Sequence, residues 1–356
     1  MLRDLKVLGI EAIAGFKGSP WKRERALHVL IQTLEGFDEA LWYSALSEVC
    51  RPGNQDVEIL LVRRKTDFYT ALMQADICTT IDISDTLFKV GSRLKWVNAL
   101  VAGIDLEGSI PASVSVTTSR GIAARSMAEH ALALIFILSR GLLQSGDVFE
   151  TWEATQRRLL KKERDLAGKT VVVVGLGSVG QELARLCRAI GMRIVAVRRR
   201  ALMEGNLYDE VYSLDDIQCA LPHADFLVLA IPLTQRTFHL VGKTELGLMK
   251  PQSYIINIAR GELIDEVELA QALRSAKIAG AGLDVLTEEP PGKNSPLRGC
   301  PSLVITPHVS GNIHRFREEI AHRFAQNLSA YLCGEPLEGL VATGDGTGAG
   351  KPGVCR

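Results

Sequence analysis

The chain has 356 residues, of which 47% are hydrophobic and 23% are charged. This composition is sufficient for a hydrophobic core without disulfides or metal ions, and the length favours two domains over one. The 41 basic and 41 acidic residues cancel, so no global field holds the protein on nucleic acid or on an anionic membrane.

Cysteine usage and the first residues indicate the compartment. The seven cysteines are scattered and contain neither a CxxC pair nor a zinc-binding spacing, which predicts a reducing compartment and no metal site. The opening segment MLRDLKVLGIEAIAG carries charges where a signal peptide needs an unbroken apolar run. The most apolar stretch, residues 131–138, is far too short to span a bilayer. We expect a cytoplasmic protein with no membrane partner.

The first 110 residues alternate between candidate strands and helical stretches. Between the first two strands, residues 20–50 carry apolar side chains at roughly helical spacing, which predicts one or two helices. The order predicts a small parallel sheet in an α/β domain. The candidate strands are LKVLGI (5–10), VEILLV (57–62), ADICTT (75–80) and LKWVNALVAG (94–103).

A short strand, VSVTT (114–118), and a long helix follow Pro111. We expect the helix to open near Ser126, with Glu129 completing a capping box, and to run to about Leu143. Apolar residues occur on nearly all sides of this helix, which indicates burial within the protein or against a second subunit. A homodimer is therefore expected.

From Lys169 onward the pattern is typical of a doubly wound sheet. KTVVVVGLGSVG, QELARLCRAIG and MRIVAV predict a strand, a glycine-rich turn with a helix, and a second strand. Further strands are expected at ADFLVLAIP, SYIINIA, IAGAGLDV and LVITPH, with a helix at ELAQALRSA. A last helix is predicted over 315–332, and the glycine-rich tail over 343–356 is expected to be disordered.

Three glycines mark a candidate dinucleotide-binding turn. Gly175 permits the tight turn, Gly177 lets a pyrophosphate approach the backbone, and Gly180 allows helix and strand to pack closely. The N-terminus of the helix then faces the anion. A glycine-rich turn often only reverses the chain, but here strand, turn, helix and second strand are all in place. The pattern therefore favours a dinucleotide cofactor.

The residues after the second strand bear on which cofactor binds. An NAD-preferring site ends this strand with an Asp or Glu that accepts hydrogen bonds from the ribose hydroxyls. Here MRIVAV leads into Arg198, Arg199 and Arg200, whose guanidinium groups can pair with a 2′-phosphate. We predict that NADP is preferred over NAD. A basic surface turn is the alternative interpretation.

Three later segments, NIARG (257–261), LDVLTEEP (283–290) and TPHVSG (306–311), each place a reactive side chain after a strand. Ligands of open α/β sheets bind beyond the carboxyl ends of the strands, so Arg260, Glu289 and His308 can converge. Arg260 suits the carboxylate and carbonyl oxygen of a 2-keto acid, and His308 can protonate that oxygen as a hydride arrives. A carboxylate such as Glu289 against His308 favours the imidazolium.

Each of these three residues also has a plainer interpretation. An arginine after a strand often makes a surface ion pair, a Glu-Glu-Pro is usually a solvated turn, and a single histidine is usually structural. The longer motifs carry more information, because their order and spacing resemble the D-isomer specific 2-hydroxyacid dehydrogenase family. That family includes glyoxylate/hydroxypyruvate reductases and phosphoglycerate dehydrogenases, and the resemblance covers residues 94–341.

The resemblance implies roles for individual residues. Arg260 binds and polarises the substrate, Glu289 partners His308, and His308 donates the proton. The backbone of Val101, Ala102 and Gly103 resembles the loop that holds the substrate carboxylate. The implied cofactor positions are Ser178 and Val179 at the pyrophosphate, Asp284 at the nicotinamide carboxamide, and Ala230, Ile231, Pro232, Ile258, Ala259 and Gly311 along the cofactor.

The resemblance also implies an α/β fold of two doubly wound parallel-sheet domains. A Rossmann cofactor domain, residues 112–311, is inserted in a flavodoxin-like substrate domain formed by residues 1–111 and 312–342. Closure of a hinge between them would exclude water. The family is usually dimeric through the first long helix of the inserted domain.

Two alternatives stay open. The chain could be a cofactor-gated, corepressor-like binding protein of the same fold, although the charge balance gives no sign of nucleic-acid contact. The substrate could also be an acid with a second anionic or bulky group, for which Arg63, Arg64 and Arg125 are candidate contacts. Arg198 stands where the family is usually acidic, which puts the use of NAD in doubt.

Overall fold

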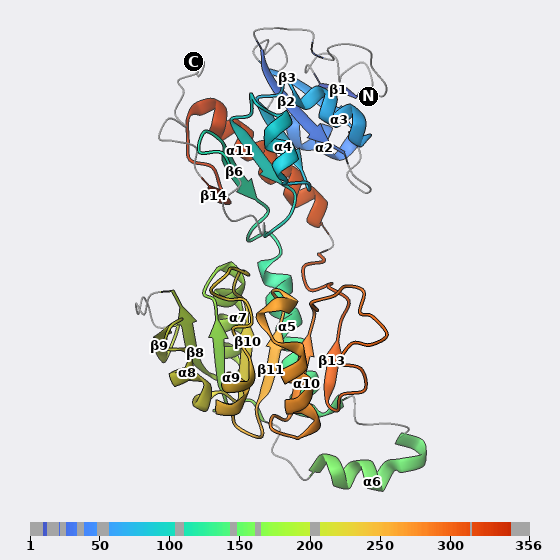
Figure 1. Ribbon diagram of the computed structural model, residues 1–356, viewed down its shortest axis with the longest axis vertical. Helices are drawn as coiled ribbons and strands as arrows, with labels where there is room; N and C mark the ends of the chain where they lie inside the picture. Colours follow the sequence, from blue (N-terminus) through green and yellow to red (C-terminus); the bar gives the residue numbers. More distant parts are fainter. Residues whose placement is uncertain are drawn as a thin grey trace. The chain divides into compact units, whose positions relative to one another are not determined.

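The computed structural model describes residues 10–12, 21, 26–33, 39–47, 57–103, 110–142, 148–160, 165–199, 207–313 and 315–342. They form two compact units, each described by itself. The first unit comprises Met1–Ile122 and His314–Arg356, and the second comprises Ala123–Ile313. Each unit contains one sheet, parallel except for one edge strand of the first unit, with helices on both faces (Figure 1).

The sheet of the first unit has the order β1-β3-β2-β4-β5-β6-β14. Every pair is parallel except β6 and β14, which are antiparallel. The inner strands, β3-β2-β4-β5-β6, follow the flavodoxin-like order, and β1 and β14 extend the sheet at its two ends. The strands are β1 (Ile10–Ala12), β2 (Leu27–Gln32), β3 (Val57–Val62), β4 (Ile77–Thr80), β5 (Trp96–Ala99), β6 (Ser115–Thr118) and β14 (Leu340–Ala342).

Helices cover both faces of this sheet. Those of the first unit are α2 (Glu39–Ser47), α3 (Lys65–Leu72), α4 (Asp85–Val90) and α11 (Phe316–Cys333). Side chains of α2 and α11 pack on one face, and those of α3 and α4 pack on the other. The Trp96 ring stacks on Phe324 of α11, with ring centroids 5.3 Å apart. α11, from the later part of the sequence, therefore completes the core formed by the N-terminal part of the first unit.

The predicted helices over residues 20–50 are only partly correct. α2 lies in this range, but β2 occupies Leu27–Gln32. Leu30 and Ile31 are both fully buried, and they belong to the cores on opposite faces of the sheet. A central parallel strand is apolar on both faces and shows no alternation. Its apolar run therefore could not be separated from a helical pattern by spacing alone.

The sheet of the second unit is parallel throughout, with the order β13-β12-β11-β10-β7-β8-β9. The order reverses between β7 and β10, and in a Rossmann sheet a dinucleotide binds at this switch point. The strands are β7 (Thr170–Val174), β8 (Arg193–Arg198), β9 (Glu210–Ser213), β10 (Phe226–Leu229), β11 (Tyr254–Asn257), β12 (Gly280–Leu283) and β13 (Leu303–Ile305).

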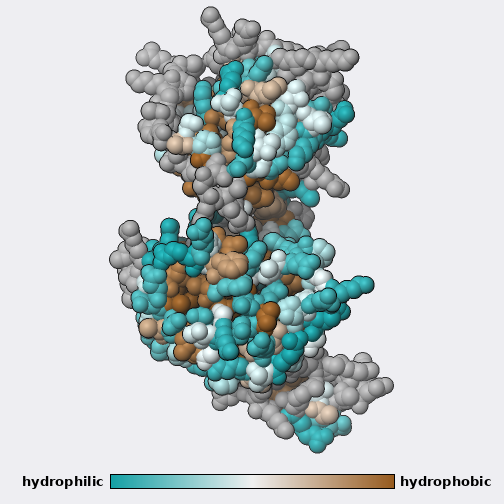
Figure 2. Space-filling model, viewed as in Figure 1, coloured by the Kyte–Doolittle hydropathy of each residue, from teal (hydrophilic) through white to brown (hydrophobic). Residues whose placement is uncertain are grey.

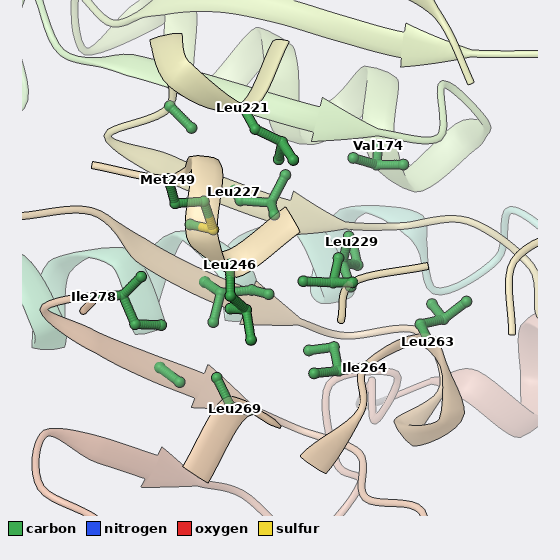
Figure 3. Packing of buried hydrophobic residues seen from close by; sticks show 14 of the residues in the cluster. Val174, Leu221, Leu227, Leu229, Leu246, Met249, Leu263, Ile264, Leu269 and Ile278 are labelled. Atoms are coloured by element: carbon green, nitrogen blue, oxygen red, sulfur yellow. The ribbon is translucent and has the colours of Figure 1, made fainter. Parts of the chain in front are cut away.

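Alternate residues of these strands enter two separate cores. One core lies against α5 and α7, and the other lies against α8, α9 and α10. Figure 3 shows the second core, where Leu246 of α9 and Leu269 of α10 point toward the strands. The helices are α5 (Ala124–Arg140), α6 (Val148–Leu160), α7 (Ser178–Ala189), α8 (Ile217–Ala220), α9 (Lys243–Leu248) and α10 (Glu266–Arg274), with short 3-10 turns η2 (Leu221–His223) and η3 (Gly261–Leu263).

The start of α5 differs from the predicted capping box. α5 begins at Ala124, and the residue at its N-cap is Ala123, which makes no side-chain cap. The Ser126 hydroxyl instead donates to the carbonyl oxygen of Ser310 at 2.9 Å. Ser126 therefore ties the helix to a loop far away in the sequence, which local spacing cannot predict.

Most other elements agree with the sequence. The two doubly wound parallel-sheet domains and the strands from β10 to β13 are confirmed, whereas β9 and β14 were not predicted. Residues 5–9 and the tail from Thr343 lie outside the described residues. In the described part of the chain, no helix is both long and apolar enough to cross a membrane. Hydrophilic side chains cover much of the face of each unit seen in Figure 2.

Candidate active site

The sequence-predicted residues of the second unit follow neighbouring strands at one edge of its sheet. The glycine-rich turn follows β7 and Ala230 follows β10, while Arg260, Asp284 and His308 follow β11, β12 and β13. Because all seven strands are parallel, these positions share the carboxyl edge. The strands β7, β10, β11, β12 and β13 are adjacent in the sheet in the same order as in the sequence. The residues that follow them therefore run in that order from the glycine-rich turn to His308.

The glycine-rich turn packs too closely for side chains. Gly175 has φ +99°, and a Cβ there would lie 2.3 Å from the carbonyl oxygen of Ala230. A Cβ on Gly180 would lie 1.9 Å from the carbonyl oxygen of Gly175. α7 begins at Ser178, and its N-cap residue, Gly177, has no side chain with which to cap the helix. The first N–H groups of α7, those of Ser178 and Val179, can therefore bind an anion.

Two arginines lie at the carboxyl end of β8, the strand beside β7. Arg198 is the last residue of β8 and pairs in the parallel ladder with Ser213, and Arg199 beside it is exposed. Arg200 lies outside the described residues. A guanidinium thus stands where an NAD-preferring Rossmann sheet carries a carboxylate.

The remaining predicted cofactor residues follow β10 and β11, except Gly311, which follows β13. Ala230 donates its N–H to Val174 at 2.8 Å, which joins the two sides of the switch point. The carbonyl of Pro232 accepts the Thr237 hydroxyl at 2.8 Å. Ile231 and Ile258 are buried, and Ala259 is half-buried. At Gly311 a Cβ would meet Ala123 at an ordinary 3.8 Å.

His308 and Glu289 form the predicted pair. Nδ1 of His308 lies 2.8 Å from Oε2 of Glu289, and Oε1 of Glu289 accepts the Leu286 N–H at 2.8 Å. Both side chains remain partly open to solvent, at 51% and 37% exposure. Since a carboxylate only accepts hydrogen bonds, Nδ1 of His308 carries the hydrogen. Nε2 is then the nitrogen available to a substrate.

Arg260 lies in a turn that packs against the loop bearing Glu289. The Asn257 amide donates to the carbonyl of Arg260 at 2.7 Å, and Arg260 itself donates to the carbonyl of Ala259 at 2.8 Å. The next residue is Gly261, where a Cβ would lie 2.0 Å from the carbonyl carbon of Leu286. Only glycine permits this approach, so the backbone brings the Arg260 turn and the Glu289 loop together.

Asp284 holds the loop that carries His308. Its carboxylate is fully buried and accepts hydrogen bonds from the Thr306 hydroxyl and from the N–H groups of Val309 and Ser310, at 2.6–2.9 Å. Burial raises the pKa of Asp284, but these hydrogen bonds outweigh burial and hold the pKa below the ordinary aspartate value. His308 itself has φ +54°, and its N–H donates to the carbonyl of Asp284 at 2.8 Å.

The predicted substrate loop lies in the first unit. Val101 to Gly103 follow β5 at the carboxyl edge of that sheet, and Ser119 donates its N–H to the carbonyl of Val101 at 3.0 Å. Ala102 and Gly103 are exposed. Backbone N–H groups in such a loop can bind a carboxylate.

The three additional arginines are each paired with a carboxylate. Arg63 lies 3.5 Å from Glu39, and Arg64 lies 3.9 Å from Asp67. Arg125 belongs to the second unit and makes hydrogen bonds of 2.6 Å with Glu129 and with Glu182 of α7. Existing partners weaken the case that any of them binds a second anionic group of a substrate.

Sequence reasoning missed several residues of this site. Thr306 and Ser310 stand in the quoted TPHVSG motif, but their hydrogen bonds to Asp284 cannot be read from spacing. His130 lies on α5, with Nε2 2.9 Å from the Thr306 hydroxyl. Its only signal in the sequence was a polar residue beside an apolar run. Over the part of the chain that the structure describes, no cluster of three or more His, Cys, Asp or Glu side chains is placed to hold a metal ion.

Known proteins resemble the chain in sequence and in structure. A family model described as D-isomer specific 2-hydroxyacid dehydrogenase, NAD binding domain, matches residues 132–310. The glyoxylate reductase of Thermococcus onnurineus is 34% identical over 269 residues, which are 73% of this chain and 79% of that relative. These similarities extend beyond the cofactor-binding turn to most of the chain.

Two solved structures share the fold. A D-isomer specific 2-hydroxyacid dehydrogenase family protein from Aeromonas salmonicida has a TM-score of 0.72 at 28% identity, covering 89% of this chain and 99% of its own. A D-isomer specific 2-hydroxyacid dehydrogenase from Xanthobacter autotrophicus, in complex with NADPH and MES, has a TM-score of 0.71 at 25% identity, covering 89% and 98%. The chain therefore belongs to the D-isomer specific 2-hydroxyacid dehydrogenase family, nicotinamide-dependent oxidoreductases that interconvert 2-keto and 2-hydroxy acids.

Proposed function

We propose that this enzyme uses NADPH to reduce glyoxylate, hydroxypyruvate or a similar short 2-keto acid to the D-2-hydroxy acid. The observation that carries the proposal is the 2.8 Å contact between His308 and Glu289 at the carboxyl edge of the second sheet. A paired imidazole at this edge can donate a proton to a carbonyl oxygen. The glyoxylate reductase of Thermococcus onnurineus, at 34% identity, supports the choice of substrate class.

The residues present fit a nicotinamide dinucleotide. Gly175 and Gly180 leave no room for side chains, and the first N–H groups of α7, at Ser178 and Val179, are those a pyrophosphate needs. Six further predicted residues follow strands that end at the same edge of the sheet: Ala230, Ile231, Pro232, Ile258, Ala259 and Gly311. When bound, the reduced cofactor supplies the hydride.

The roles of the protein side chains follow from their chemistry. Arg260 binds the substrate carboxylate and polarises the carbonyl. His308 donates a proton from Nε2 to the carbonyl oxygen, while Glu289 keeps the imidazole oriented through Nδ1. Burial of Asp284 and its contacts to residues 306–310 keep His308 in place, and we propose that it also lies near the nicotinamide carboxamide.

The substrate is tested with a panel of 2-keto acids. We expect NADPH oxidation with glyoxylate or hydroxypyruvate and a much lower kcat/KM with long or branched acids. Tight NADPH binding without turnover of any acid in the panel would instead favour the cofactor-gated binding protein.

NADP preference rests on Arg198 and Arg199. A phosphate bound by guanidinium groups forms charge-assisted hydrogen bonds that NAD lacks. The Xanthobacter autotrophicus relative was solved with NADPH, which supports the same choice. We expect a higher kcat/KM with NADPH than with NADH, and a ratio that favours NADH would contradict the preference.

A homodimer and a cytoplasmic location are further proposals. Phe136 on α5 and Leu142 after it are exposed at 36% and 56%, which supports an apolar contact with a second copy. Sedimentation of the purified chain distinguishes a dimer from a monomer. The cysteines Cys78, Cys187, Cys219 and Cys300 are free thiols, which is usual in a reducing compartment.

A further inference from the structure

The loop that carries His308 is attached to α5 through a chain of hydrogen bonds. Thr306 stands two residues before His308, and its hydroxyl lies 2.6 Å from Oδ1 of Asp284 and 2.9 Å from Nε2 of His130. The same Oδ1 lies 3.5 Å from Nε2 of His130. His130 therefore contacts Thr306 and lies close to Asp284, although it is not among the residues given a catalytic or cofactor-binding role above.

The direction of these hydrogen bonds follows from the hydrogen atoms that Asp284 and Thr306 carry. The ionised carboxylate of Asp284 only accepts, so the single hydrogen of the Thr306 hydroxyl points to Asp284. The hydroxyl can then only accept from His130. Nε2 of His130 must carry a hydrogen, and the donors run one way from His130 through Thr306 to Asp284.

α5 holds this loop at a second point. One turn before His130, the Ser126 hydroxyl donates to the carbonyl oxygen of Ser310 at 2.9 Å and to that of Asn312 at 3.3 Å. Residues on both sides of His308 are thus attached to the same helix. His308 has φ +54°, a conformation that non-glycine residues adopt only when their surroundings impose it.

We propose that His130 is a positioning residue for catalysis: it fixes Thr306, and through Thr306 and Asp284 it holds His308 in the orientation from which it donates its proton. This inference rests on the proposed role of His308. His130 does not touch the reacting atoms in this account. A displacement of a catalytic group by about 1 Å can cost about 100-fold in rate, so a remote hydrogen bond can affect kcat strongly.

Two matched pairs of variants of the full chain test the proposal in the NADPH-dependent reduction of glyoxylate. His130→Leu and Thr306→Val remove the hydrogen bond, whereas His130→Gln and Thr306→Ser each keep a polar group in place. We expect kcat to fall about tenfold in each of the first two variants and to recover in the second two. KM for NADPH should stay the same throughout, because the glycine-rich turn is untouched.

The double variant His130→Leu/Thr306→Val adds a sharper test. If both residues act through one hydrogen bond, the double variant should be no slower than the slower single variant. Full multiplication of the two effects, or wild-type kcat in both single variants, would overturn the proposal. Thr306→Val exchanges the hydroxyl for a methyl group, so it tests the hydrogen bond even if His130→Leu does not fold.

His308→Ala in the same assay separates the role of His308 as proton donor from the role of His130 as positioning residue. If His308→Ala turns over like the wild type, the role of His308 is wrong and the positioning role fails with it. If His308→Ala is inactive while His130→Leu and Thr306→Val are normal, only the positioning role is wrong.

Discussion

Nδ1 of His308 and Oε2 of Glu289 lie 2.8 Å apart, and the other oxygen of Glu289 accepts the N–H of Leu286 at 2.8 Å. Both oxygens of the carboxylate are therefore engaged, one by the imidazole and one by the backbone. The backbone contact fixes the carboxylate, and the carboxylate in turn fixes the ring. This leaves Nε2 of His308 for the substrate oxygen.

Glu289→Gln should lower kcat without weakening cofactor binding. An amide can still accept from Nδ1 of His308, but it lacks the negative charge that strengthens this hydrogen bond. We expect kcat for glyoxylate to fall about 10- to 100-fold. Glu288→Gln is the matched control, since Glu288 is its exposed neighbour and has no contact with His308 among the described interactions. Equal activity of the two variants would mean that the Glu289 charge has no catalytic role.

Gly261→Ala should destabilise the second unit and reduce activity together. The added Cβ would lie 2.0 Å from the carbonyl carbon of Leu286, so the Arg260 turn and the Glu289 loop must separate. We expect a loss of about 1–3 kcal/mol in the free energy of unfolding. Gly247→Ala is the control, because a Cβ in that exposed position of α9 meets nothing within 4 Å. There the helix should gain about 0.5–1 kcal/mol. Thermal unfolding of both variants measures the contrast, and equal melting temperatures would contradict it.

These residues show what the sequence could and could not predict. Residues 169–198 have strand, turn and helix signals that agree with one another, and the β7-α7-β8 unit is where they predict it. The sequence pattern of β2 predicts part of a helix, because a strand buried on both faces lacks the two-residue period. The positions of Arg260, Glu289 and His308 along the chain were available from the motifs.

The contacts that organise the site were not available from spacing. Gly261 meets Leu286, Ser126 meets Ser310, and His130 meets Thr306, each pair being separated by at least 25 residues. Each contact exists only because parallel strands bring their carboxyl ends together or because α5 packs beside them. Local propensity carries no information on such pairs.

Asp284→Asn should make stability depend less on pH in the acid range. The folded-state pKa of Asp284 lies below its ordinary value of about 3.9, so ionised Asp284 stabilises the fold above that pH. This contribution is lost as the pH falls through the folded pKa. At pH 7 the variant should lose about 1–3 kcal/mol, because an amide group faces N–H donors that need an acceptor.

Unfolding of wild type and Asp284→Asn from about pH 7 to about pH 3 provides the measurement. The difference between their unfolding free energies should shrink below about pH 4. A difference that stays constant over the whole range would contradict the hydrogen-bonded carboxylate described here.

The double variant Arg198→Ala/Arg199→Ala should lose its preference for NADPH. Each hydrogen bond to a charged group is worth about 1.5–3 kcal/mol, so kcat/KM with NADPH should fall at least about tenfold, while that with NADH stays similar. Arg193→Ala is the control, because Arg193 lies at the opposite end of β8 and pairs with Glu210. A parallel loss with both cofactors would indicate a structural role for the two arginines.

In the proposed reaction, His308 donates the proton that accompanies hydride transfer to a 2-keto acid. The most direct measurement compares kcat for NADPH-dependent reduction of glyoxylate by the wild type and by His308→Ala, with NADPH affinity measured by fluorescence on the same samples. We expect a loss of about 10²- to 10⁴-fold in kcat with unchanged affinity for NADPH. A variant that binds NADPH normally and reduces glyoxylate at the wild-type rate would contradict it.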